Sequence, residues 1–289
     1  MKKNILLVVN PISGDIDKTE LIDTVAAFTA VKNRNFNLYE TQGAGDILNI
    51  KKIFHELNPE RIIIAGGDGT IKMVGEALEH DDVIFGILPA GSANGLATDL
   101  DLPNTTEDCL DIIFKDKFIE LDMVVINGKK SLHLSDIGLN AELIKNYENG
   151  TIRGKLGYVI QAISTFIDRE EPFRALIEVN EMRIECEARM IVMANSQKYG
   201  TGVVINPAGV INDGKFELII LKNLDLFVLG QIISGTTVVE PENVEIISTD
   251  YAKITTNRPV NFQIDGEYCG TETVLTVGMS PSKMKITVA

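Results

Sequence analysis

Short runs of apolar residues alternate with helical patterns through the first part of the chain. Strand-like runs lie at 5–9, 37–41, 61–65 and 83–88, and residues at helical spacing fill the stretches between them. Thr105, three residues before Asp108, forms a capping box that predicts the start of a further helix. Strands that alternate with helices are typical of a parallel sheet built from strand–helix–strand units. The pattern predicts a doubly wound α/β domain.

After about residue 120 the pattern changes to that of antiparallel strands. Asn127-Gly128, between apolar runs at 118–126 and 130–137, predicts a hairpin, since this dipeptide accepts the positive φ of a type I′ turn. Further strand-like segments lie at 175–179, 182–186, 190–194, 216–221, 244–248, 272–279 and 284–288, and helices are predicted at 156–167 and about 224–233. We therefore divide the chain into an α/β domain, 1–125, and a β-rich domain, 126–289, and expect the chemistry in the cleft between them.

Composition and charge narrow the class of protein. The chain has 289 residues, 45% of them hydrophobic, with 27 Lys+Arg against 41 Asp+Glu, a formal charge of −14. This content predicts a compact fold, and the acidic total argues against a nucleic-acid partner. Three widely spaced cysteines without a CxxC pair indicate neither a zinc site nor a disulfide framework. The apolar run at 5–9 is too short for a signal peptide, so we expect a cytoplasmic protein.

Three polar, glycine-bearing loops follow strands of the predicted parallel sheet. They are Asn10–Gly14, Gly66–Thr70 and Pro89–Gly95. Glycines let backbone N–H groups approach a polyphosphate, a helix N-terminus adds positive potential, and Asp68 offers a carboxylate for Mg²⁺ or a hydroxyl. One such loop alone could be a tight turn. Because the carboxyl ends of parallel strands share one edge, the three together predict a nucleotide-sized polar site, with Thr70 as a helix cap.

These motifs resemble one family over nearly the whole chain. Asn-Pro-x-Ser-Gly, Gly-Gly-Asp-Gly-Thr and Leu-Pro-x-Gly-Ser-x-Asn are similar to the diacylglycerol kinase catalytic-domain family, the bacterial lipid kinases related to sphingosine kinases. The similarity continues at 193–195, 199–202, 206–208, 213–214 and 265–267. It implies a nucleotide-binding α/β domain and a β-sandwich domain, with ATP-dependent phosphorylation of a lipid hydroxyl between them.

The resemblance also implies roles for individual residues. ATP is expected on Asn10, Ser13, Gly14, Thr41, Gly66, Gly67, Asp68, Gly69, Thr70 and Ser92. Glu267 is expected to be the general base, with Asp68 and Asp122 supporting Mg²⁺ and the phosphates. A structural Mg²⁺ is expected on the Asp213 side chain and the backbone of Val210 and Lys215. From the residues alone, 213–214 and 265–267 are better interpreted as ordinary turns, and Asp122 as a strand-end carboxylate.

Some alternatives stay open. Gly95 stands where the bacterial pattern has Asp, so the acceptor lipid is undecided between a diacylglycerol-like and a sphingosine-like alcohol. Lys72 stands where the pattern often has Asn, and it either contacts a phosphate or faces solvent. NAD kinase is the nearest rival enzyme, and a non-catalytic nucleotide-binding module is the rival from another class. The segment 156–167 either lines an acyl-chain pocket or packs on the core. Transient contact with a membrane surface and a homodimer are the partners expected besides the lipid.

Overall fold

The computed structural model describes residues 2–15, 17–92, 94–139, 141, 171–198, 204–222 and 243–289. The helices predicted at 156–167 and 224–233 lie outside these residues. The chain forms two compact units. The first contains the residues up to Asp122 together with Pro281–Ala289, and the second contains the described residues between 123 and 280.

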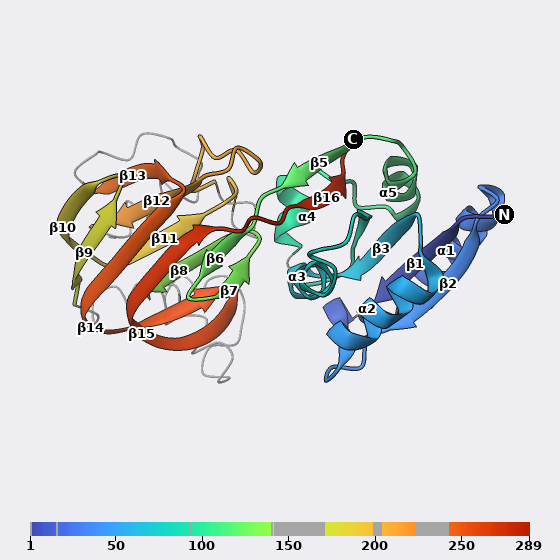
Figure 1. Ribbon diagram of the computed structural model, residues 1–289, viewed down its shortest axis with the longest axis horizontal. Helices are drawn as coiled ribbons and strands as arrows, with labels where there is room; N and C mark the ends of the chain where they lie inside the picture. Colours follow the sequence, from blue (N-terminus) through green and yellow to red (C-terminus); the bar gives the residue numbers. More distant parts are fainter. Residues whose placement is uncertain are drawn as a thin grey trace. The chain divides into compact units, whose positions relative to one another are not determined.

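The first unit is built on a sheet with the strand order β2-β1-β3-β4-β16-β5 (Figure 1). The strands are β1 (Asn4–Val9), β2 (Asn35–Glu40), β3 (Arg61–Gly66), β4 (Ile84–Pro89), β5 (Phe118–Leu121) and β16 (Met284–Thr287). All neighbouring strands are parallel except β5 and β16. The parallel sheet predicted from the alternating pattern is confirmed.

Helices cover both faces of this sheet. They are α1 (Thr19–Val31), α2 (Asp46–Leu57), α3 (Asp68–Ala77), α4 (Gly95–Asp99) and α5 (Thr106–Ile113), preceded by a short 3-10 turn, η1 (Ser13–Asp15). Ile5 and Leu7 pack in one cluster with residues of α1 and α5, while the alternate residues Leu6 and Val8 are fully buried on the other face. Helix α2 contacts α3. This is the doubly wound arrangement, and the predicted cap of α5 is present, because Thr105 accepts a hydrogen bond from the N–H of Asp108 at 3.3 Å.

One strand departs from the prediction. The apolar run at 284–288 was predicted among the antiparallel strands of the second domain, but β16 lies in the sheet of the first unit, where it appears dark red in Figure 1. Lys285 is in parallel register with Ile84 of β4 and in antiparallel register with Glu120 of β5. The first unit therefore takes its residues from both ends of the sequence, which differs from a division into 1–125 and 126–289.

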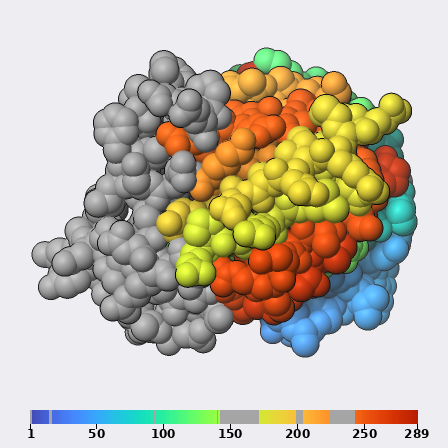
Figure 2. Space-filling view, turned by 90° about the vertical axis from the view of Figure 1, so that its left-hand side faces the viewer, coloured from blue at the N-terminus to red at the C-terminus, as the bar shows by residue number. Residues whose placement is uncertain are grey.

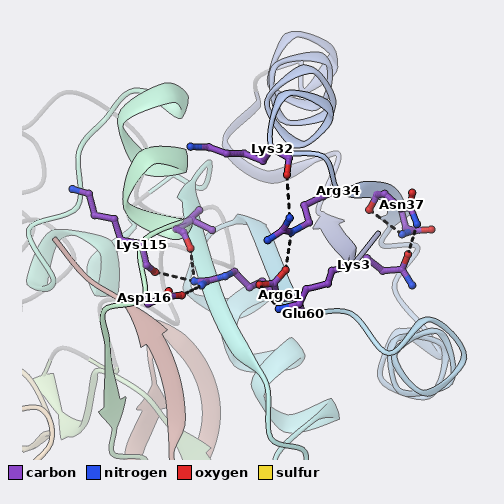
Figure 3. A network of polar contacts seen from close by, with 11 residues as sticks. Lys3, Lys32, Arg34, Asn37, Glu60, Arg61, Lys115 and Asp116 are labelled. Atoms are coloured by element: carbon purple, nitrogen blue, oxygen red, sulfur yellow. Dashed lines mark hydrogen bonds and ion pairs between the residues drawn. The ribbon is translucent and has the colours of Figure 1, made fainter. Parts of the chain in front are cut away.

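The amino ends of β1, β2 and β3 are joined by a polar network (Figure 3). Arg61, the first residue of β3, is 4% exposed. Its guanidinium donates to the carbonyl oxygens of Ile113 at 2.6 Å and Lys115 at 3.0 Å and to the carboxylate of Asp116 at 2.6 Å. Arg61 thereby ties the end of α5 to the start of a central strand.

Glu60 joins two further strands at the same edge. Its carboxylate accepts hydrogen bonds from Lys3 at 3.1 Å and Arg34 at 2.8 Å (Figure 3). Burial alone would raise the pKa of Glu60, but the hydrogen bonds and charges of Lys3 and Arg34 outweigh it and hold this pKa below its usual value. This edge of the sheet is therefore closed by ion pairs, and the loops of interest follow the opposite, carboxyl ends of the strands.

The second unit is the predicted β-sandwich. Its strands are β6 (Val124–Ile126), β7 (Lys129–Ser131), β8 (Leu134–Gly138), β9 (Phe173–Val179), β10 (Met182–Ala188), β11 (Met190–Ala194), β12 (Phe216–Leu221), β13 (Val244–Thr249), β14 (Tyr251–Ile264) and β15 (Glu267–Met279). They follow the order β13-β12-β11-β8-β14-β15-β6-β7, and β9 pairs with β10 and β14. On the face shown in Figure 2, the yellow surface of β9 and β10 lies beside the orange-red surface of the C-terminal strands.

Buried apolar side chains of the second unit form two clusters, one of which joins strands that are remote in the sequence. Phe216, Phe262 and Ile177, from three different strands, belong to the same buried cluster. The hairpin turn predicted at Asn127-Gly128 is confirmed by φ values of 48° and 81°. Its strands are β6 and β7 only, because residues 118–121 of the predicted run form β5 in the sheet of the first unit. Strand β14 was missed, because the stretch from Thr255 to Pro259 is polar and contains a break in register that hides the alternation on either side.

Candidate active site

Three loops emerge at the carboxyl ends of adjacent parallel strands in the first unit. They follow β1, β3 and β4, which are neighbours in the sheet (Figure 1). The ladder continues into the loops, since the N–H of Asn10 donates to the Ala65 carbonyl at 2.9 Å and the N–H of Ala90 to the Gly66 carbonyl at 3.1 Å. The convergence expected from the sequence is therefore present.

Side chains of the first loop bind it to the other two. The Ser13 hydroxyl lies 2.9 Å from the Asn10 carbonyl oxygen and 2.8 Å from that of Ala90. The Asn10 amide donates to the Thr70 hydroxyl at 3.3 Å. Gly14 has a φ of 66°, and a Cβ there would stand 2.9 Å from the Ala90 carbonyl oxygen. These residues fix the shape of the site through contacts with one another.

Glycines allow the second and third loops to touch. A Cβ added to Gly91 would stand 2.4 Å from the Cα of Gly67, and one added to Gly67 would stand 3.3 Å from the Cα of Gly91. Within the second loop, a Cβ added to Gly66 would stand 2.5 Å from the Thr70 hydroxyl oxygen. Gly67 has an ordinary extended φ of −95°, so a side chain here is restricted by the close approach of Gly91 and not by backbone strain. Ser92 is exposed in the third loop, just after this contact.

The Asp68 carboxylate links α3 to the start of α4. Its two oxygens accept hydrogen bonds from the N–H groups of Gly95 at 2.7 Å and Leu96 at 3.0 Å. Both oxygens are thus engaged by backbone donors, an arrangement that the sequence did not indicate. The role of Asp68 toward Mg²⁺ stays a prediction.

Thr70 does not cap α3. The cap position is Gly67, whose carbonyl accepts from the N–H groups of Thr70 at 2.9 Å and Ile71 at 3.1 Å, and no side chain caps the helix. Thr70 and Gly69 lie inside the first turn, and the Thr70 hydroxyl meets Asn10 instead. The prediction of a Thr70 cap was wrong, because the helix begins three residues earlier than a cap at 70 requires.

Thr41 belongs to a fourth loop, after β2. Its N–H donates to the Val9 carbonyl at 2.8 Å, and the following residues are held by Asp46, which is 2% exposed. Asp46 accepts from the N–H of Gln42 at 3.0 Å, the N–H of Gly43 at 2.8 Å and the Tyr39 hydroxyl at 2.6 Å. Burial raises the pKa of Asp46, but these hydrogen bonds lower it by more than burial raises it. The pKa of Asp46 is therefore below its usual value.

Two further residues that contact the three loops were not among the predicted site residues. Asn94, with a φ of 53°, closes the third loop on itself, because its side chain accepts from the N–H of Gly91 at 2.8 Å and donates to the Gly91 carbonyl at 2.9 Å. Lys18 is 5% exposed, and its ammonium group donates to the Ser13 carbonyl at 2.7 Å. The signal available for Asn94 was its position three residues after a loop glycine. No pattern in the sequence indicated Lys18.

Asp122 has a different setting from the loop residues. It is 2% exposed and forms an ion pair with Lys283 at 2.7 Å. Asp122 follows β5 and Lys283 precedes β16, so the pair joins the two segments of the chain that complete the first sheet. The recorded contact favours a structural role, and a role in binding phosphates stays a prediction.

In the second unit, Glu267 is the first residue of β15 and is exposed. It follows the turn Asp265-Gly266, whose φ values are 50° and 87°, and stands in register with Ile264. The turn reading of 265–267 is therefore correct in geometry. Within the described part of the chain, the Glu267 carboxylate has no hydrogen-bond or ion-pair partner.

The predicted metal ligands lie in a turn before β12. The Asp213 carboxylate accepts from the N–H of Lys215 at 3.0 Å, Gly214 has a φ of 79°, and Val210 is 48% exposed. The described residues contain no cluster of three or more His, Cys, Asp or Glu side chains placed to hold a metal ion. A cation here would depend on carbonyl oxygens beside the one carboxylate.

Two protein families match this chain, one over each of its two parts. The family described as the diacylglycerol kinase catalytic domain matches residues 4–126, and the YegS C-terminal NAD kinase beta sandwich-like domain matches residues 136–288. The chain is 27% identical over 222 residues to a probable lipid kinase YegS-like of Xanthomonas oryzae pv. oryzae (71% of this chain, 72% of that protein). It is 27% identical over 252 residues to a probable lipid kinase YegS of Salmonella arizonae (83% of each).

Solved structures agree on the fold. A putative diacylglycerol kinase from Bacillus anthracis superposes with a TM-score of 0.82 at 21% identity, over 99% of this chain and 97% of that one. An NAD kinase from Archaeoglobus fulgidus in complex with ATP superposes with a TM-score of 0.58 at 11% identity, over 98% and 93%. Among the described helices, none has the length and apolar content needed to cross a membrane.

Proposed function

Because this chain belongs to the family of lipid kinases that joins a diacylglycerol kinase catalytic domain to a YegS C-terminal domain, we propose that it transfers the γ-phosphate of ATP to the hydroxyl of a lipid. The acceptor is an alcohol, and the products are a phosphorylated lipid and ADP. The named relatives are probable lipid kinases, whereas the likeness to NAD kinase is one of fold. A lipid acceptor is therefore preferred to NAD.

One observation carries the proposal, namely the three mutually bonded loops at one edge of the first sheet. They present backbone N–H groups and the N-terminus of α3 without intervening Cβ atoms at Gly66 and Gly67. Backbone donors at the start of a helix favour a polyphosphate, because the aligned peptide dipoles add positive potential there. We assign the ATP phosphates to this surface.

The residues proposed for ATP contribute in different ways. Asn10, Ser13 and Thr70 shape the surface by bonding to the neighbouring loops. Gly67, Gly69 and Ser92 are the positions whose backbone or side chain is open to the nucleotide. Thr41 borders the same edge from the loop after β2. Asp68 fixes the start of α4 and is also the carboxylate proposed to support Mg²⁺ at the phosphates.

Two Mg²⁺ ions with different roles are proposed. One accompanies ATP, as phosphoryl transfer ordinarily requires, and the other is structural. Hard cations prefer carboxylate and carbonyl oxygens, and the side chain of Asp213 with the carbonyls of Val210 and Lys215 is a set of that kind. The hydrogen bond from the Lys215 N–H to Asp213 brings this carboxylate to the backbone of the same turn. We propose these three residues for the structural Mg²⁺, which would neutralise the carboxylate and fix the turn.

Glu267 is proposed as the general base. A lipid hydroxyl is a weak nucleophile, and a carboxylate beside it can take up its proton as the oxygen attacks the γ-phosphorus. The bond from the γ-phosphorus to the bridging oxygen then breaks, and ADP leaves with that electron pair. Glu267 suits this role because its carboxylate is exposed and unengaged within the described part of the chain.

The experiment is a phosphoryl-transfer screen with radiolabelled ATP and Mg²⁺. The acceptors are diacylglycerol, sphingosine, ceramide and undecaprenol in mixed micelles, with NAD in a parallel reaction. We expect transfer to at least one lipid and none to NAD. Transfer to NAD alone would favour the rival NAD kinase, and ATP binding without transfer to any acceptor would favour a non-catalytic nucleotide-binding module.

A further inference from the structure

The turn that precedes Glu267 is bound, through the carboxylate of Asp265, to the link between β7 and β8 at residues 131–133. One oxygen accepts from the Ser131 hydroxyl at 2.8 Å and the His133 N–H at 3.0 Å, and the other accepts from the Leu132 N–H at 3.1 Å. The Asp265 N–H in turn donates to the Leu134 carbonyl at 3.1 Å. These hydrogen bonds hold the two residues that separate β7 from β8, where no strand is present.

The same link between β7 and β8 is also bound by Asn195. Its side-chain amide donates to the Leu132 carbonyl at 3.0 Å, and its N–H donates to the His133 carbonyl at 3.0 Å. Asn195 is 1% exposed. The motif at 193–195 thus supports the segment on which Asp265 rests.

A second contact reaches the turn through Gln263. This side chain is 1% exposed, and its two ends are both used. Its amide nitrogen donates to the Asp136 carboxylate at 2.5 Å, and its amide oxygen accepts from the Gly266 N–H at 2.7 Å. Asp136 is fully buried on β8, in register with Gln263. A buried carboxylate therefore fixes the Gln263 amide, which in turn fixes the Asp265–Gly266 peptide in the turn before Glu267.

The hairpin itself does not require this network. An Asp-Gly pair forms a two-residue turn of its own accord, and burying Asp136 and Gln263 costs free energy that only good hydrogen bonds offset. A general base, in contrast, must be held within a few tenths of an ångström of its working position by neighbours that are themselves fixed.

We infer that Asp265 and Gln263 are positioning residues that set the place of the Glu267 carboxylate. The inference rests on the proposed function, since it gives Glu267 the role of base. Neither residue is required to touch the lipid or ATP. Their removal should therefore lower kcat with little change in the KM for ATP.

The chain offers a variant for each contact. Asp265→Asn keeps the size and tolerates the φ of 50°, but its amide nitrogen would face N–H donors. Gln263→Glu keeps the acceptor for Gly266 and places two carboxylates together. Combining it with Asp136→Asn reverses the bond, because the new amide at 136 can donate to the new carboxylate at 263. Glu272→Gln, on the same strand as Glu267, is the matched control.

We would measure kcat, the KM for ATP and thermal unfolding for each variant, with the lipid that the screen identifies. Asp265→Asn and Gln263→Glu should each lower kcat by about 10- to 100-fold, as loss of supporting contacts does at other sites. The double variant should recover most of the loss, and Glu272→Gln should resemble the unmodified protein. Full kcat in both folded single variants, or no recovery in the double variant, would overturn the inference.

Amide hydrogen exchange of the segment 264–268 supplies a readout without substrate. Exchange should be faster in Gln263→Glu than in the unmodified protein and slow again in the double variant. If the unmodified protein phosphorylates no lipid, the proposed function and the positioning role both fail, and the exchange rates still show whether the network holds the turn. Unchanged exchange in Gln263→Glu would contradict the network itself.

Discussion

The Asp68 carboxylate accepts a hydrogen bond from the Gly95 N–H at 2.7 Å, which couples the start of α3 to the start of α4. The residue that sequence reasoning assigned to Mg²⁺ is thus also the link between two nucleotide loops. Whether Asp68 acts on the phosphates directly or through this link can be separated by measurement.

Asp68→Asn should weaken ATP binding and lower kcat together, each by about tenfold or more, because hydrogen bonds to a charged group contribute about 1.5–3 kcal/mol. The amide of the variant can serve only one of the two N–H groups that the carboxylate serves. Calorimetric titration with ATP and steady-state kinetics test this, with the exposed Asp111→Asn as control. A loss of kcat with unchanged ATP affinity would assign Asp68 to the transfer step instead.

Gly67→Val should abolish ATP binding while the protein stays folded. A Cβ at this position already stands 3.3 Å from the Cα of Gly91, and the two further methyl groups of Val would push the loops apart. Binding of a fluorescent ATP analogue and the thermal midpoint are the measurements. Gly278→Ala, where the nearest atom is an ordinary 3.8 Å away, is the control. Retained affinity in a folded Gly67→Val protein would refute the placement of ATP.

Glu267→Gln should lower kcat by about 10²- to 10⁴-fold and leave ATP affinity unchanged, since it removes the proton acceptor and preserves the shape. Steady-state kinetics on the identified lipid and calorimetry with ATP give the two values. Glu272→Gln should leave both near those of the unmodified protein. Near-normal kcat in Glu267→Gln would place the base elsewhere, with Asp68 or Asp122 next to be tested.

Asp46→Asn should destabilise the first unit by about 1–3 kcal/mol at pH 7, because three donors lose a charged acceptor. The folded pKa of Asp46 lies below its usual 3.8, so its contribution is complete above that value and is lost as the pH falls through the folded pKa. Urea unfolding at neutral and acid pH tests this against Asp23→Asn, an exposed carboxylate on α1. A difference from the unmodified protein that stays constant into acid would contradict the assignment.

The sequence predicted those parts of the fold that depend on local pattern. Strands β1, β3 and β4 are short buried runs, and each is followed by turn residues that mark where its loop begins. Strand β14 was not predicted because the polar residues around Thr256 separate its two ends, each of which alternates over only a few residues. The place of β16 depends on a partner, Ile84, that is remote in sequence, and no local pattern specifies such pairing.

The candidate site divides in the same way. The meeting of the three loops follows from the rule that parallel strands end at one edge, so it was accessible. The contacts of Asp68 with Gly95, and of Gln263 with Asp136, join residues from different elements and appear only once the strands are paired. Asp46 carried a weak local signal, an acidic residue at the first position of a helix, but its bonds to the Gln42 and Gly43 peptides needed the turn to be known.

The pairing of β16 with both β4 and β5 has a consequence for the order of events during synthesis. The ribosome releases Met284–Thr287 after every other described strand, and until then β4 lacks its second neighbour and β5 has none. The first unit therefore cannot close its sheet as it emerges, and the second unit is translated while that gap is open. An N-terminal fragment ending near Asp122 would present the bare edge of β4 to other chains, so cutting the protein at that point should give material prone to self-association.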